Sequence, residues 1–239
     1  MMLVMLLFFA CGSPPPLERV SDALAADAVA DAAPAIGLLV STAALVAEPC
    51  AIESVDGYLW RGEGARALGV TTADVSIDES SGEKTWDFGV VSLVAGSDDD
   101  GESVVTGGLS ITLDSARTSA TVAFTGDVAF TADLTVIACR ADADDIYADR
   151  VLVQGEGHYT VDDDTAVASI DGDPPDKALE WAPSNALLPA SGWMEWTSAD
   201  DKTSYALESA AYIEPDSRAW PGVATGREGW EGDAAFTLP

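Results

Sequence analysis

The only histidine of the chain, His158, is the natural starting point for chemistry, because a Ser-His-Asp or Cys-His mechanism would require it. Glu156 lies two residues away, so strand alternation places both side chains on one polar face. The opposite face carries the apolar residues Val151, Val153, Tyr159 and Val161. The Glu156–His158 pair could serve as an acid–base pair or as metal ligands. An ordinary exposed strand face explains the same pattern, and we favour that interpretation.

A second candidate is Glu195, which stands between Trp193 and Trp196. Carboxylates hydrolyse glycosides and aromatic rings stack on sugars, so this segment leaves a carbohydrate-active hydrolase open, with both tryptophans as binding aromatics. Strand alternation would group Trp193 with Glu195 and Met194 with Trp196, which assigns one tryptophan to the core. The chain contains neither a G-x-S-x-G nor an H-E-x-x-H motif.

Aspartate clusters offer oxygen ligands for calcium. They occur at residues 98–102, 142–149, 162–164 and 171–176, and the metal candidates are Asp98, Asp100, Asp171 and Asp173. EF-hand loops begun at Asp98 or Asp171 would end at Leu109 or Ala182, where the motif requires Glu. Calcium is therefore an alternative, as in a calcium-dependent adhesion or binding module. Solvated turns of an acidic protein explain the clusters equally well.

The N-terminus indicates where the protein resides. Residues 1–10, MMLVMLLFFA, are uncharged and apolar, which matches a signal-peptide core and is too short to span a bilayer. Ala10, Cys11, Gly12 and three prolines follow. This segment resembles a bacterial lipoprotein precursor. The resemblance implies cleavage after Ala10, a lipid on Cys11 as membrane anchor, and, from Gly12, sorting to the outer membrane or cell surface. A buried N-terminal strand is the alternative, but the proline triplet favours a solvated spacer.

If Cys11 carries lipid, the remaining cysteines Cys50 and Cys139 form an even pair. In an oxidising compartment this predicts one disulfide, and two reduced thiols are the alternative. Closing a loop of about 90 residues would stabilise the fold by roughly 4–5 kcal/mol on the chain-entropy model.

Composition limits the range of partners. The chain has 239 residues, 48% of them apolar, and a formal net charge of −30. The apolar content is ample for a core. With 11 Lys and Arg against 41 Asp and Glu, the sequence argues against nucleic acid and against an anionic membrane face bound through a basic patch.

The elements that position these residues are strands. Residues 11–35 read as a Pro/Ala-rich tether, in which the Ala-rich residues 21–31 form a frayed helix or a linker, and residues 36–46 read as a first strand. Further strands are expected at 70–78, 85–95, 109–113, 120–138, 151–161, 165–171, 205–213 and 234–238. Within 120–138 the apolar residues occupy even positions, so the chain must turn back near Gly126 through a three-residue loop or bend there. A two-residue loop would turn the second apolar set outward.

We therefore expect an all-β protein, an antiparallel sandwich or barrel-like domain over residues 36–239, with a possible sub-boundary near 172–190. We expect an exported, lipid-anchored protein with a binding or structural role and no enzymatic activity. The calcium-dependent module and the hydrolase are the alternatives.

Overall fold

The computed structural model describes residues 18–48, 58–60, 63–97, 102–141, 148–170, 178–181, 192–198, 203–209, 219–226 and 229–237. The helices are α1 (Asp22–Ala47) and α2 (Glu63–Ala67). The strands are β1 (Glu18–Arg19), β2 (Asp74–Ile77), β3 (Lys84–Ser97), β4 (Glu102–Leu113), β5 (Ser119–Gly126), β6 (Ala129–Ala141), β7 (Ala148–Val161), β8 (Asp164–Ile170), β9 (Leu179–Trp181), β10 (Gly192–Thr197), β11 (Thr203–Ser209), β12 (Ala219–Gly226) and β13 (Trp230–Thr237).

All of these strands belong to one sheet, in the order β1-β13-β12-β11-β10-β8-β7-β6-β5-β4-β3-β2, with β9 attached to β7. The β1–β13 pair is parallel and the other described pairs are antiparallel. The sheet curls until β13 meets β3, where Phe236 pairs with Ser97 and Thr237 with Gly96. The predicted all-β class is confirmed, as a barrel-like sheet that is joined along this seam only at those two pairs within the described residues.

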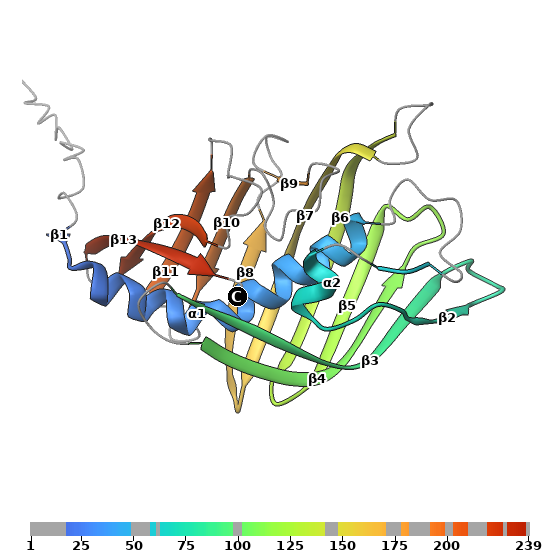
Figure 1. Ribbon diagram of the computed structural model, residues 1–239, viewed down its shortest axis with the longest axis horizontal. Coiled ribbons are helices and arrows are strands. Elements are labelled where there is room, and N and C mark those ends of the chain that lie inside the picture. The colour runs from blue at the N-terminus through green and yellow to red at the C-terminus, as the bar shows by residue number, and fades with distance from the viewer. Residues whose placement is uncertain are drawn as a thin grey trace, which may run out of the picture.

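Helix α1 lies inside the curl of the sheet (Figure 1). It contacts strands from all around the curl, including β3, β7, β10 and β13. Every residue from Ala32 to Ala47 is buried. A helix that is apolar on all sides needs such an environment. By length and composition residues 23–47 could also cross a membrane, a test that a core helix passes equally, and almost all of the most apolar window is buried.

This helix corrects two expectations about the N-terminal third. The strand expected at residues 36–46 is wrong, because those residues form the second half of α1. Residues 22–35, expected as a tether with a frayed helix or linker at 21–31, form the first half of the same helix and are not a separate tether. Residues 18 and 19 already pair with β13, so the described part of the folded domain begins at Glu18 rather than at residue 36.

The strands expected after residue 70 are largely confirmed, and so is the rule that fixes their register. Thr125 pairs with Ala129, so a three-residue loop, Gly126 to Val128, connects β5 and β6. The two-residue loop is excluded, as predicted. The loop is centred one residue later than expected, because Phe124 pairs with Phe130 rather than with Val128. Strands β8 and β10, which flank the possible boundary near 172–190, pair directly in the one sheet.

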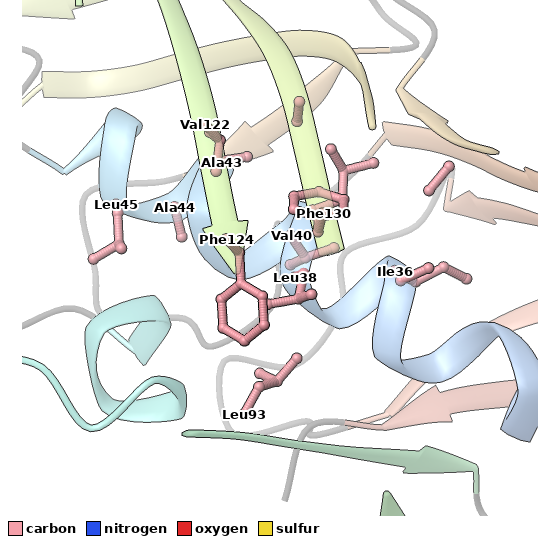
Figure 2. Close-up of a cluster of buried hydrophobic side chains, with 14 of the residues drawn as sticks. Ile36, Leu38, Val40, Ala43, Ala44, Leu45, Leu93, Val122, Phe124 and Phe130 are labelled. Carbon is pink, nitrogen blue, oxygen red and sulfur yellow. The ribbon is translucent and has the colours of Figure 1, made fainter. Parts of the chain in front are cut away.

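The core forms between the inner face of the sheet and α1. Val122 and Phe124 of β5, Phe130 of β6 and Leu93 of β3 are buried and gather around the helix (Figure 2). Their outward neighbours Thr121, Thr125, Thr131 and Asp133 are exposed. Alternation therefore separates an apolar interior that holds α1 from a polar outer face.

Candidate functional site

Glu156 and His158 lie on the outer face of β7, as strand alternation predicts. His158 Nε2 is 3.1 Å from Glu156 Oε1, and the two side chains are 51% and 57% exposed. Val151 and Val153 are buried on the opposite face, whereas Val161 at the strand end is exposed. The pair is therefore open to water on the convex side of the sheet.

Cross-strand pairing places two further carboxylates, those of Asp133 and Glu195, in the same row across the sheet as Glu156. Glu156 lies opposite Asp133 of β6 and opposite Ser169 of β8, and Ser169 lies opposite Glu195 of β10. We call this set, Asp133, Glu156, Ser169 and Glu195, the outer acidic row. Sequence reasoning missed the row, because only the strand order and register show that these residues are neighbours.

Each carboxylate of the outer acidic row has a close polar neighbour among the described residues. Thr121 Oγ1 donates to Asp133 Oδ1 at 3.0 Å, and Trp193 Nε1 donates to Glu195 Oε1 at 3.1 Å. His158 is the neighbour of Glu156. A buried, apolar setting is one way in which proteins adapt a carboxyl group for acid catalysis, and the exposed outer face is not such a setting. The row offers a surface for contacts instead.

The two tryptophans that flank Glu195 separate as alternation predicts. Met194 and Trp196 are buried against the interior, whereas Trp193 is half-buried on the outer side beside Glu195. Trp196 is only 4% exposed, so it is a core residue and not a surface aromatic. Of the proposed binding aromatics, Trp193 alone remains at the surface.

The other predicted site residues lie outside the described part of the structure. These are Cys11, Cys50, the side chain of Cys139, and the calcium candidates Asp98, Asp100, Asp171 and Asp173. The lipid anchor, the disulfide and the calcium sites therefore remain predictions. Among the described residues, no group of three or more His, Cys, Asp or Glu side chains is arranged to hold a metal ion.

An aromatic cluster closes the core at the C-terminal end of α1. The ring of Trp60 makes edge contacts with Tyr58, Trp86 and Phe88 at centroid distances of 5.0–5.1 Å. Trp60 Nε1 donates to the carbonyl oxygen of Leu45 at 3.1 Å, which satisfies one of the last carbonyls of the helix. The alternation of Trp86 and Phe88 in β3 is the sequence signal for this cluster. Its burial gives it a structural role.

Two turn aspartates have lowered pKa values. At Asp114, desolvation alone would raise the pKa, but hydrogen bonds from Ser119, Thr118 and Arg117 outweigh it. At Asp78, hydrogen bonds from Ser80 and Ser81 lower the pKa. Burial raises the pKa of the Tyr159 hydroxyl on β7. Each of these three shifts arises from a turn or from core packing.

Comparison with known proteins assigns the chain neither to a family nor to a known fold. No family model matches the chain, and neither a curated protein nor a solved structure gives a significant match. The chain is an all-β protein whose curled sheet encloses a helix, and its function has to be argued from its own residues.

Proposed function

We propose that the chain is an exported, lipid-anchored protein whose β domain has a binding or structural role at the bacterial cell envelope, without catalysis. The observation that carries this proposal is the division of the domain into an occupied interior and a polar exterior. Residues 32–47 of α1 are buried inside the curl, and the candidate polar residues Glu156, His158 and Glu195 lie on the exposed outer face. Such a domain meets partners through its outer surface.

The early start of the folded domain supports an anchor close to the membrane. The Glu18 amide donates to Gly229 O at 2.7 Å and the Val20 amide to Glu231 O at 2.8 Å. Arg19 forms an ion pair with Asp233. Seven residue steps separate Cys11 from Glu18, which at 3.3–3.6 Å per residue allows a reach of about 25 Å. A lipid on Cys11 would therefore hold the domain within about 25 Å of the bilayer surface, much closer than a tether to residue 35 would.

The anchor is tested by metabolic labelling of the full chain with an alkyne fatty acid in a bacterial host that processes lipoproteins. We expect the wild-type chain to carry the label and Cys11→Ala to lose it. Cys50→Ala is the matched control and should keep the label, because the lipid belongs to Cys11. An unlabelled wild-type chain, or a labelled Cys11→Ala chain, contradicts the proposal.

A further inference from the structure

Strand β1, the described element closest in sequence to Cys11, is fixed to one end of the domain. The Val20 amide, directly after β1, donates to Glu231 O of β13 at 2.8 Å. The start of α1 lies against the same strand, because a Cβ at Gly232 would be 2.7 Å from the Ala25 Cβ. Figure 1 shows β1 at one end of the longest axis of the domain. The N-terminal segment is therefore attached to an end of the domain and not to a side.

Strand β2 lies at the opposite end of the longest axis (Figure 1). Aromatic contacts connect the C-terminal end of α1 to it. Trp60 Nε1 donates to Leu45 O, and the Trp60 and Trp86 rings are 5.1 Å apart. Trp86 in turn pairs with Val75 of β2. The 26 residues of α1 alone cover about 39 Å at 1.5 Å per residue, so the two ends of the domain are well separated.

The charge of the chain opposes close contact with an anionic membrane. The net charge is −30, and bilayers that contain anionic lipids have a negative surface potential. This repulsion decays over a Debye length of about 8 Å at physiological ionic strength. The end that carries β1 is itself acidic, since residues 18–31 contain Glu18, Asp22, Asp27 and Asp31 against Arg19.

We propose that the lipid-anchored domain stands upright on an anionic bilayer, with β1 towards the lipid surface and the β2–β3 turn, residues 78–83, furthest from it. A lipid on Cys11 would hold one end of the longest axis within about 25 Å of the bilayer. Repulsion acts on charges along the whole axis, so it turns the free end outward. Three prolines between Cys11 and Glu18 favour an extended connection, which opposes folding back. The inference rests on the proposed lipid anchor.

The upright orientation defines which end of the domain is presented to the surroundings. Lys84 pairs with Leu113, so the β2–β3 turn and the β4–β5 turn, residues 114–118, lie at the same end of the sheet. A Cβ at Gly82 would be 3.2 Å from the Ser115 Cβ, which shows that the two turns are neighbours. We call these two turns the displayed end. A partner that approaches the membrane from outside meets the displayed end first.

The test is resonance energy transfer from a dye on the lipid-bearing chain to acceptor-labelled lipids, in vesicles of equal parts phosphatidylcholine and phosphatidylglycerol. The dye is attached at Leu24→Cys, near β1, or at Glu79→Cys, in the displayed end, with Cys50→Ser and Cys139→Ser in both chains. We expect at least about twofold more transfer from position 24, since about 39 Å of helix separates the two ends. Asp27→Cys, exposed in the same part of α1, is the matched control and should give the same transfer as position 24.

Repulsion also predicts the direction of the salt effect. The Debye length shrinks from about 10 Å at 0.1 M to about 3 Å at 1 M salt, so the excess of transfer from position 24 should decrease at high salt. Vesicles of phosphatidylcholine alone should decrease it in the same way, because they lack the anionic lipid. An excess that neither change reduces would overturn repulsion as the cause of the orientation.

Equal transfer from positions 24 and 79 at low salt, or more transfer from position 79, would overturn the upright orientation. These results are distinct from a failure of the proposed function. A chain that carries no lipid in the labelling experiment rejects the anchor, whereas a lipid-bearing chain with equal transfer rejects the orientation alone.

Neutron reflectometry of the wild-type lipid-bearing chain on a supported bilayer of the same composition is a second measurement that needs no variant. We expect a protein layer thicker than the length of α1, about 39 Å, above a hydrated gap of up to about 25 Å. A thinner protein layer in direct contact with the lipid headgroups would overturn the proposal. Thermal unfolding of the dye-bearing variants serves as their folding check.

Discussion

Single residues set how closely the strands approach one another in this sheet. Phe124 and Phe130, paired across β5 and β6, lie against glycines of the strands on either side. A Cβ at Gly107 of β4 would be 2.8 Å from Phe124 ring carbons and 2.7 Å from Thr125 O. A Cβ at Gly157 of β7 would be 2.6 Å from the Phe130 ring. The rings of Phe124 and Phe130 therefore lie over Gly107 and Gly157, where there is no space for a side chain.

We predict that Gly107→Ala lowers the free energy of unfolding by about 1–3 kcal/mol, since neither the ring nor the backbone oxygen can move away without strain. The adjacent Gly108→Ala is the control, because the nearest atoms to its Cβ are 3.9 Å away. It should be neutral or stabilising by less than about 1 kcal/mol. Chemical denaturation of both variants makes the comparison, and equal effects would show that the ring does not lie against Gly107.

The turn between β4 and β5 depends on a single carboxylate. Asp114 accepts hydrogen bonds from the Thr118 amide at 2.7 Å, the Thr118 hydroxyl at 2.8 Å and the Ser119 amide at 3.1 Å. These bonds stabilise a turn in which Arg117 has φ 58. They also hold the pKa of Asp114 below its ordinary value of 3.8. Because the pKa is lowered on folding, this carboxylate stabilises the fold above pH 3.8, and the contribution is lost as pH falls through the folded-state pKa.

Asp114→Asn should therefore destabilise the protein at pH 7 by about 1 kcal/mol, a value that allows for solvent screening of this exposed turn. The difference between variant and wild type should begin to shrink as pH falls below 3.8 and should be smallest below the lowered folded-state pKa, where the wild-type carboxyl group is also neutral. Asp163→Asn, in an exposed turn, controls for the general relief of negative charge. A destabilisation that is the same at pH 7 and pH 3 would indicate that the carboxylate charge has no part in the turn.

Among the elements, α1 determines how the sheet closes. Leu38, Leu39, Val40 and Leu45 are fully buried although they point in different directions around the helix. The helix therefore presents apolar surface to strands on several sides, and the curl of the sheet follows from covering it. Gly64 of α2 allows a further close approach, because a Cβ there would be 2.5 Å from the Ala44 Cβ.

We predict that Leu39→Ala, at a fully buried position of α1, costs about 2–5 kcal/mol of unfolding free energy through lost burial and a cavity. Leu24→Ala in the same helix is the control, since Leu24 is 44% exposed. That substitution should cost less than about 1 kcal/mol. Similar losses in the two variants, measured by denaturant unfolding, would place the helix outside the core.

The sequence predicted the strands but not the helix, for a physical reason. The buried residues Val122, Phe124 and Phe130 follow a period-two pattern. Any strand with one buried face shows this pattern in its sequence, whatever the topology of the sheet. A helix that is buried on every side has no polar stripe, so its 3.6-residue period is invisible. The Ala-rich stretch, whose apolar stripe is weak, therefore favoured a tether or a frayed helix over a core element.

The exact register of the β5–β6 loop also depends on a contact between elements. The Asp127 amide donates to Thr106 O at 2.9 Å, and its carboxylate accepts from the Thr106 amide at 3.0 Å. This link to β4 centres the loop on Asp127. Local sequence fixes the parity of the loop and its length, but not a bond to a residue 21 positions away. The outer acidic row was missed for the same reason.

At the scale of the whole molecule, the apolar helix α1 lies inside, and the described charged side chains, which contribute to the net charge of −30, lie outside. The described core consists of apolar residues together with Ser41 and Thr42, so the charged side chains are confined to surfaces and turns. Because α1 fills the interior of the curl, the proposed binding role would fall to the outer face. Among the described residues, the polar outer face is available to partners, and the proposed lipid anchor would hold it near the membrane.

The arrangement of α1 within the sheet is the central claim, and hydrogen–deuterium exchange of the full chain, read by mass spectrometry, tests it most directly. Amides of residues 32–47 should exchange as slowly as those of β5 and β6, because both open only when the whole domain unfolds. The solvent-facing first turns of α1, near Leu24, should exchange faster. Exchange of residues 32–47 at the rate of an unstructured peptide would contradict the enclosed helix.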